Sequence, residues 1–403
     1  MTLASFIPSV SGMNAMSKAQ ESVAQNIVNM NTTGYKQKQT LFYTLLGSSG
    51  MNVGSQSGLN SSRADITGVD AFNRTNIDIE GTARATGNAF DVAIHGNPNA
   101  FYKLHDGYGN YFYTRAGDFR KSAQDGKAYL TSSSGLYVQG FKSVNGENEF
   151  SNTVSDIVID VSNTIPQKAT TKASIIANLP AKDIDKSIYS VLIYSDSYDG
   201  SNLNLTFDRV VGQHNAWNLS LTLEDGTAVS NETMVTFNSD GSIKSPENLD
   251  VTLNWNDGSS SNVAIDISKM TQLGVNTSVV NIQQNGFPSG NLLSLGFNDD
   301  GILTAKYSND TALSIAKLAI SGFTAPENLE PYNTTLFETT GEVGNEFYID
   351  PKGIIIPQSV ETSTVNLEDE FARMITVQRA YSLNAQSLTV NDEMISLLVD
   401  LKS

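Results

Sequence analysis

Residues 367–399 read LEDEFARMITVQRAYSLNAQSLTVNDEMISLLV and hold the strongest helical pattern in the chain. The apolar side chains recur in alternating steps of four and three residues, which is the spacing of a helix that packs along one seam. Gln378 and Asp392 occupy the two remaining seam positions. The acidic run Glu368–Glu370 falls in the first turn, where the helix dipole favours negative charge. The seam side chains are Leu367, Phe371, Met374, Tyr381, Ala385, Leu388, Ile395 and Val399.

A weaker pattern of the same kind occupies the N-terminal end of the chain. Its apolar positions again alternate in steps of three and four, with Gln20 at the one polar seam position. The pair Thr33-Gly34 is typical of a helix end, and residues 1–46 are therefore predicted to be a helix followed by a short tail. The seam side chains here are Met13, Met16, Val23, Ile27 and Met30.

From about residue 65 to 360 the pattern is that of β-strands. Apolar and polar residues alternate strictly, for example over 203–207 and 217–223, as in strands with one buried face. Asp-Gly and Asn-Gly pairs separate these runs and indicate hairpins. Phe237–Gly241 and Phe297–Gly301 are near copies and predict similar turns. The fold class expected is mainly β with helical termini, in which the two helices pair as in a coiled coil around nested β domains of sandwich or barrel type.

Changes in composition suggest a nested order of domains. A Gly/Ser-rich stretch is typical of a flexible connector, and breaks near Pro166 and Asn285 bound a segment that interrupts the β region. We expect a helical inner polymerisation domain from 1–46 and 361–403, a connector at 47–64, a first β domain from 65–165 and 285–360, and an inserted outer β domain at 166–284.

The composition excludes several classes of protein. The chain has 403 residues, 25 basic against 42 acidic side chains and a net charge of −17, which disfavours nucleic acid and anionic membranes as partners. It has no cysteine, so disulfides, thiolate zinc sites and iron–sulfur clusters are excluded. No apolar run reaches the roughly 18–20 residues that cross a bilayer. The first charged residue is Lys18, and no cleavable signal peptide is expected.

The two terminal stripes favour self-assembly. A single helix of this kind is marginal in water, and pairing the two helices covers only one side of each. Other apolar side chains remain for a further partner, and a second copy of the chain is the simplest one; a contact that does not close gives a helical filament or tube. A monomer with a two-helix stalk is the alternative. The side chains left over are Phe6, Ile7, Val10, Ile375 and Leu398.

Three ordered blocks resemble the bacterial flagellar rod and hook proteins. The N-terminal block is Val10-Ser-Gly-Met13, Asn26-Ile27-Val28-Asn29 and Thr32-Thr33-Gly34-Tyr35-Lys36. The C-terminal block is Val365-Asn366-Leu367, Met374-Ile375, Gln378-Arg379, Tyr381, Asn384-Ala385 and Asp392-Glu393-Met394. The third, in the first β domain, is Phe90–Gly96, Phe112–Phe119 and Val138–Phe141. We take Asn29, Thr32, Gly34, Tyr35, Lys36, Gln378, Arg379, Asn384 and Asp392 as the family signature.

The resemblance implies an extracellular structural polymer without a cofactor or a metal. Within the family, the large inserted segment is typical of hook subunits, which form a curved tube that joins rod to filament as a universal joint; a distal rod subunit is the alternative. Implied partners are many copies of the chain, rod proteins, a hook cap protein, a hook–filament junction protein and the type III export apparatus, through which the chain would leave the cell without a cleaved signal. Membrane insertion is not implied.

Candidate residues for chemistry are few. His95, His105 and His214 stand apart in sequence and form no metal motif. The acidic turns at 196–200 and 298–301 lack the closing glutamate of a calcium loop and are better explained as turns. Pairs of carboxylates for glycoside hydrolysis are not excluded by sequence alone. A secreted β-rich adhesin or carbohydrate-active enzyme is therefore a third hypothesis, but it leaves the terminal stripes without a purpose.

Overall fold

The computed structural model describes residues 6–46, 66–124, 126–144, 146, 148–182, 185–196, 200–229, 232–255, 258–274 and 276–400. The predicted connector at 47–64 and the side chains of Leu398 and Val399 lie outside this part. The chain divides into two compact units. Unit 1 comprises 1–160, 295–304 and 313–403, and unit 2 comprises 161–294 and 305–312. The expected fold class, mainly β with a helix near each end, is confirmed.

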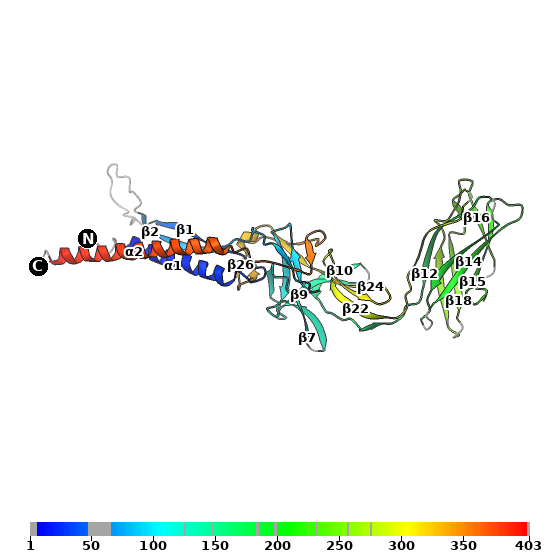
Figure 1. Ribbon diagram of the computed structural model, residues 1–403, viewed down its shortest axis with the longest axis horizontal. Coiled ribbons are helices and arrows are strands. Elements are labelled where there is room, and N and C mark those ends of the chain that lie inside the picture. Colours follow the sequence, from blue (N-terminus) through cyan, green and yellow to red (C-terminus); the bar gives the residue numbers. More distant parts are fainter. Residues whose placement is uncertain are drawn as a thin grey trace, which may run out of the picture. The chain divides into compact units, whose positions relative to one another are not determined.

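Unit 1 contains both helices, α1 (Ile7–Val28) and α2 (Leu367–Asp400), which pack side by side and antiparallel (Figure 1). Helix α2 begins at the predicted residue because Asn366 accepts a hydrogen bond from the backbone N–H of Glu368, at 3.0 Å. Helix α1 ends at Val28, before the predicted Thr33-Gly34. The Asn29 side chain donates to the Gln25 carbonyl at 2.8 Å there, and so satisfies a carbonyl at the helix end.

A long two-stranded hairpin lies against α1. It consists of β1 (Lys38–Leu46) and β2 (Ile66–Thr75), which pair antiparallel, so that the sequence predicted as a tail forms a strand. Lys18 of α1 donates to the carboxylate of Asp70 at 2.9 Å and to the carbonyl of Ala71 at 3.0 Å. The Asn26 side chain bonds both the N–H and the carbonyl of Lys38, at 2.8 Å each. Polar contacts therefore fix the hairpin on the helix.

The rest of unit 1 is a β domain whose aromatic core includes Phe101, Tyr113, Phe323 and Phe337. Strand β5 pairs antiparallel with β6, β9 and β25, and so lies at the centre of the domain. The early strands are β3 (Ala83–Ala85), β4 (Val92–Ile94), β5 (Ala100–His105), β6 (Tyr111–Thr114), β7 (Arg120–Gln124), β8 (Lys127–Thr131), β9 (Tyr137–Ser143) and β10 (Phe150–Asp156). The late elements are β25 (Ile320–Phe323), the 3₁₀ turn Pro326–Asn328, β26 (Glu330–Pro331), β27 (Leu336–Glu338), β28 (Glu346–Ile349), β29 (Ile355–Pro357) and β30 (Ser359–Glu361).

A fully buried ionic cluster joins three distant segments of unit 1. Glu361, at the end of β30, receives Lys36 Nζ on Oε1 and Arg115 Nε on Oε2, each at 2.7 Å. The N–H of Gly81 also donates to Glu361 Oε1, at 2.8 Å. Arg115 Nη1 donates to the carbonyls of Asn97 and Ala100 at 2.8 and 2.7 Å. Burial lowers the pKa of Lys36, with Arg115 acting in the same direction and Glu361 opposing it.

The backbone beside this cluster is equally constrained. Gly34 N–H donates to the carbonyl of Glu361 at 2.9 Å, and Thr364 N–H donates to the carbonyl of Tyr35 at 3.1 Å. Gly34 has a φ of +67°, and a Cβ there would lie 2.4 Å from the backbone nitrogen of Ala116. Only glycine fits this position. The segment after α1 and the segment before α2 are thus held together against the β domain.

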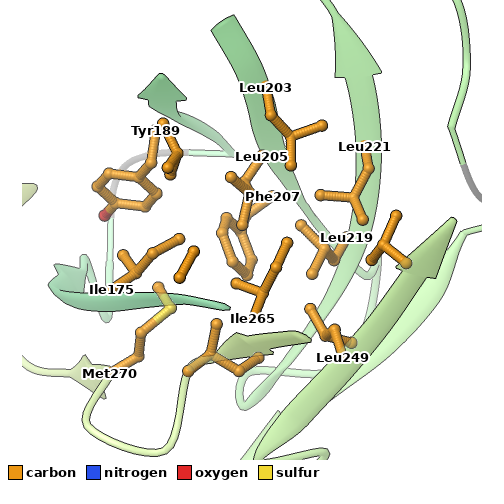
Figure 2. Close-up of a cluster of buried hydrophobic side chains, with 14 of the residues drawn as sticks. Ile175, Tyr189, Leu203, Leu205, Phe207, Leu219, Leu221, Leu249, Ile265 and Met270 are labelled. Carbon is orange, nitrogen blue, oxygen red and sulfur yellow. The ribbon is translucent and has the colours of Figure 1, made fainter. Parts of the chain in front are cut away.

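Most of unit 2, from β12 to β21, is a sandwich of two β-sheets. One sheet has the strand order β13-β14-β15-β16-β17, and the other has β18-β19-β12-β20 with β21 also paired to β12. One cluster of buried side chains draws on both sheets, with Leu203, Phe207 and Leu219 from the first facing Ile175 and Ile265 from the second (Figure 2). The two turns predicted to be alike, one in unit 2 and one in unit 1, close in the same way. In each, the backbone N–H of the asparagine donates to the carbonyl of the residue after the glycine, Asn238 to Ser242 at 2.8 Å and Asn298 to Ile302 at 3.0 Å.

Strands β11 to β24 lie between residues 164 and 318. They are β11 (Thr164–Ile165), β12 (Lys172–Leu179), β13 (Lys186–Ile193), β14 (Ser201–Arg209), β15 (Ala216–Leu223), β16 (Thr233–Phe237), β17 (Ile243–Ser245), β18 (Asn248–Asn254), β19 (Ser260–Asp266), β20 (Thr271–Gln272) and β21 (Ser278–Gln284). After these come β22 (Gly290–Phe297), β23 (Ile302–Tyr307) and β24 (Ala312–Leu318).

We predict that Glu361→Gln destabilises unit 1 selectively. The change removes the counter-charge in direct contact with buried Lys36 and leaves Arg115 with only the carboxylate of Glu80, 3.6 Å from its Nη2. Removing one partner of a buried pair costs about 3–5 kcal/mol. Both helices lie in unit 1, whereas both tryptophans, Trp217 and Trp255, lie in unit 2. In urea, the helical circular dichroism transition should move to lower denaturant while the tryptophan fluorescence transition stays in place.

The matched control is Leu203→Ala in the core of unit 2. Leu203 is fully buried, and truncating such a side chain costs about 2–5 kcal/mol. This variant should move the tryptophan transition and leave the helical one unchanged. If both transitions moved together in either variant, the two units would not unfold independently, contrary to their separate cores.

A second prediction concerns pH and the hairpin contact. The bond from Lys18, then those from Ala71 and Tyr43, lower the pKa of Asp70 to about 2. A lowered carboxyl pKa contributes stability that is present above the unfolded pKa, 3.8 here, and is lost as the pH falls towards 2. Asp70→Asn should therefore lower the helical unfolding midpoint at neutral pH. The difference from the unmodified chain should vanish between about pH 4 and pH 2; a difference that persists in acid would contradict this assignment.

Candidate assembly surface

The predicted seam of the N-terminal helix is only partly covered within one chain. Val23 is buried, and the side chains before and after it are half-buried or exposed. The half-buried ones are Met13, Met16 and Ile27, and Met30 is exposed. Gln20, at the polar seam position, is also exposed. This stripe is therefore not the face that α1 turns toward the rest of its own chain.

The face that α1 buries consists of small residues instead. Gly12, Ala15 and Ala19 are buried, with Ser9, Ser22, Val23 and Asn26 beside them. A Cβ on Gly12 would lie 2.9 Å from the Asn384 side-chain oxygen, and Ser9 Oγ donates to Ser387 Oγ at 3.2 Å. Small side chains allow the two helix axes to approach closely. The same 3–4 periodicity is visible in the sequence, in small rather than large residues.

The predicted seam of α2 is divided in a similar way. Leu367, Met374, Ala385, Leu388 and Ile395 are half-buried, whereas Phe371 and Tyr381 are exposed. Gln378 and Asp392 are exposed as well, and the side chain of Val399 lies outside the described part. Roughly half of the stripe thus faces the rest of the chain, and the other half faces outward.

Among the described residues, fifteen large apolar side chains remain exposed on or next to the helices and the hairpin. A monomeric protein rarely leaves so many uncovered in one region, and such surfaces mark sites of interaction. On and after α1 they are Ile7, Val10, Val28 and Met30; on the hairpin, Phe42, Tyr43, Leu45 and Phe72; and on α2, Phe371, Ile375, Tyr381, Leu383, Val390, Met394 and Leu397. We call these residues together the helical surface.

The signature residues fall into two groups. The first group builds the junction between the helices and the β domain. Gly34 and Lys36 both bind Glu361. Tyr35 is buried, and its hydroxyl donates to Asn26 Oδ1 at 3.0 Å. Burial and the nearby Glu370 raise the pKa of Tyr35 to about 12, so it remains a neutral donor. Asn29 caps α1, Thr32 donates to Asn29 Oδ1 at 3.1 Å, and Asn384 packs on Gly12.

The second group is exposed and consists of Gln378, Arg379 and Asp392. Within the described part of the chain, none of the three forms an ion pair or side-chain hydrogen bond. Exposed signature residues without such a contact in their own chain are candidates for contacts with another molecule.

The side chains of two histidines and the turn at 298–301 make local contacts, whereas residues 197–199 of the other acidic turn lie outside the described part. His105 Nδ1 lies 3.1 Å from Asp156 Oδ1, and the His105 ring stacks on Tyr111. His95 Nδ1 lies 3.2 Å from Glu80 Oε1. Asn298 and Asp300 are engaged in their own turn. Over the described residues, no group of three or more His, Asp or Glu side chains is placed to hold a metal ion. Neither described helix combines the length and apolar character that a membrane span requires.

Sequence reasoning missed Glu361 and the small residues on the buried face of α1. A lone glutamate in a short strand carries no periodic signal, and its partners Lys36 and Arg115 are 325 and 246 residues away in the sequence. Leu383, Val390 and Leu397, by contrast, are seven residues apart, and that spacing was available from the sequence.

Three segments match families of flagellar proteins. Residues 9–36 match the flagella basal body rod protein family, residues 167–287 the D2 domain of the flagellar basal body protein FlaE, and residues 356–401 the C-terminal region of the flagellar basal body rod proteins FlgEFG. The first covers most of α1, the last covers α2, and the middle one lies within unit 2.

Curated relatives are similar over the whole chain. The flagellar hook protein FlgE of Salmonella typhimurium is 27 % identical, covering 99 % of this chain and 100 % of its own. That of Rhizobium meliloti is 28 % identical, covering 98 % and 97 %, and that of Treponema pallidum is 24 % identical, covering 99 % of each. All three are hook proteins rather than rod proteins.

The fold agrees with a solved structure of the same kind. The crystal structure of the Helicobacter pylori flagellar hook protein FlgE2 superposes with a TM-score of 0.53 at 14 % identity, over 69 % of this chain and 99 % of that one. At this identity the likeness concerns the fold alone. With family matches at both ends and in the insert, and similarity over the full length to hook proteins, the chain resembles the flagellar rod and hook proteins throughout, and the hook proteins in particular.

Proposed function

We propose that the chain is a structural subunit of the bacterial flagellar hook, which assembles with copies of itself into a curved tube and transmits torque from rod to filament as a universal joint. The observation that carries the proposal is the helical surface, exposed in a chain whose full-length relatives are hook proteins. We assign the protein no catalytic role, cofactor or metal.

Cohesion would come from the helices and the hairpin. Full burial of each large apolar side chain contributes at most about 1.5–3 kcal/mol of favourable free energy. Every copy of the chain exposes the same apolar side chains. A head-to-tail contact that does not close on itself repeats without limit and gives a helical polymer. In this proposal the seam positions, including Phe371, Tyr381 and Met30, are covered by neighbouring subunits.

We propose a division of labour between the segments. Residues 1–46 and 361–403 form the inner polymerisation domain, 65–165 and 285–360 the first β domain, and 166–284 the outer β domain, with 47–64 as connector. Strong apolar contacts inside and weaker polar contacts outside would let subunits slide past one another as the bent tube rotates. The buried cluster of Lys36, Arg115 and Glu361 would carry load from the helices to the β domain.

The proposed location is the extracellular hook of the flagellum, reached through the type III export apparatus without a cleaved signal peptide. Proposed partners, besides many identical copies, are rod proteins, the hook cap protein and the hook–filament junction protein. A chain without cysteine is compatible with export in an unfolded state, because no disulfide has to form afterwards.

A distal rod subunit is the less favoured alternative, because the curated relatives described above are hook proteins. Electron microscopy of hook–basal bodies from a strain that lacks the gene separates the two. Loss of the curved segment with the rod retained supports the hook assignment. Loss of the rod itself would overturn it.

We predict that Phe371→Asp prevents polymerisation of the purified chain without unfolding it. Phe371 is about half exposed on α2, so the monomer loses little, whereas an assembled neighbour would have to bury a carboxylate without a counter-charge. Sedimentation and negative-stain images should show tubes for the unmodified chain and none for the variant. The helical and tryptophan unfolding transitions should match those of the unmodified chain.

The control is Val211→Asp. Val211 is 99 % exposed and lies between β14 and β15 of unit 2, outside the helical surface. The same kind of substitution there should leave polymer yield unchanged. Tubes formed by Phe371→Asp in normal yield would count against the helical surface as the site of assembly.

A further inference from the structure

Two columns of exposed side chains run along α2, beside the stripe that faces α1. Within each column the residues are seven apart, which is two helical turns, so they line up on one face. The charged column is Ala372, Arg379, Gln386 and Glu393, and the apolar column is Thr376, Leu383, Val390 and Leu397. All eight side chains are exposed.

Most side chains of the two columns make no hydrogen bond or ion pair with the described part of their own chain, and Thr376 donates only to the Ala372 carbonyl one turn away, at 2.9 Å. Leu383, Val390 and Leu397 are 66, 53 and 63 % exposed. Arg379 and Glu393 carry opposite charges and, among the residues that the structure describes, neither makes an ion pair or a hydrogen bond. An apolar ridge flanked by one basic and one acidic group is typical of a helix that pairs with another helix in a fixed register.

The C-terminal part of α2 also extends beyond α1. The contacts of Ser9 with Ser387 and of Gly12 with Asn384 show that a step of three along α1 moves three residues back along α2. Residues 391–397 therefore lie past Phe6, the first described residue, and face no described part of α1. Within this overhang the side chains of Glu393 and Leu397 are exposed.

We propose that the overhang of α2 in one copy docks on the first half of α2 in the next copy, parallel and displaced by fourteen residues, or about 21 Å of helix. In this register Arg379 of one copy pairs with Glu393 of its neighbour. Leu383 then packs on Leu397 and Thr376 on Val390. This pairing of α2 helices sets the register of the polymer. The inference rests on the proposed function, because it requires an open assembly of identical chains.

Physical reasons favour this register over others. In an open helical assembly all copies point the same way along the axis, so neighbouring α2 helices are parallel. With no displacement, Arg379 would face Arg379 and Glu393 would face Glu393, and like charges at an interface cost several kcal/mol. A displacement of seven residues places both charges opposite Gln386, where burial without a counter-charge is unfavourable. Only at fourteen residues do the charges pair.

The test uses the absence of cysteine in the chain. The double variant Leu383→Cys with Leu397→Cys should, in oxidised tubes, give a covalent ladder of dimers, trimers and higher species, since each copy bonds its neighbour on either side. The matched variant Leu383→Cys with Val390→Cys should give none. A ladder from the second variant would establish a displacement of seven, and closed dimers from it would establish antiparallel pairing. Either result would overturn the proposal.

Charge reversal is the second measurement. Arg379→Glu and Glu393→Arg should each raise the critical concentration for polymerisation at least about tenfold, because each places like charges together. The double variant should restore it. As a control, Arg379→Glu is combined with Asp392→Arg, which reverses an acidic charge one residue before Glu393, on a different face of the helix. This combination should not restore the critical concentration. Equal rescue by Asp392→Arg would refute the specific pair.

Failure of this inference is distinguishable from failure of the proposed function. If the unmodified chain forms tubes but neither cysteine pair gives a ladder and the charge reversals have no effect, the chain assembles through another face and the register proposed for α2 is wrong. If the unmodified chain stays monomeric under all polymerising conditions, the structural function itself is wrong, and the register falls with it.

Discussion

Glu361 is the point on which unit 1 depends. Its carboxylate accepts hydrogen bonds from Lys36 in the segment after α1, from Arg115 in the β domain and from the N–H of Gly81. Its backbone carbonyl accepts a further bond from the N–H of Gly34. Three stretches of chain that are far apart in sequence are thereby fixed at one place. A buried charge is tolerated only when it is fully paired, so this site specifies a single arrangement of its neighbours. The directions in which both helices leave the β domain follow from it.

The distribution of apolar residues on the helices is the reverse of that in an ordinary helical hairpin. Small side chains such as Gly12 and Ala19 lie inside, where they let α1 and α2 approach closely, and large ones such as Phe371 and Leu383 lie outside. Large exposed side chains gain free energy only when a second molecule covers them. The pair of helices is thus built tightly within the chain and left incomplete toward other copies, which is the property a polymer subunit needs.

The two units have separate cores and different kinds of strength. Unit 2 closes one apolar cluster between two sheets, to which side chains such as Phe207 and Ile265 contribute, and it needs no other part of the chain to cover it. Unit 1 combines an aromatic cluster with the ionic one, and it also carries the whole helical surface. Assembly and stability of the outer domain can therefore change independently, and the inserted unit can vary without disturbing the contacts that make the polymer.

Local patterns in the sequence determined much of this protein. The start of α2 at Leu367, the β alternation of 203–207 and the twin turns at Phe237–Gly241 and Phe297–Gly301 all depend on neighbours within a few residues, so they could be predicted. The end of α1, the strand at 38–46 and the role of Glu361 could not be. Each of these depends on a partner far along the chain, and only the folded structure brings such partners together. The tertiary structure likewise decided which side of each amphipathic helix is buried, because periodicity defines a stripe but not what lies against it.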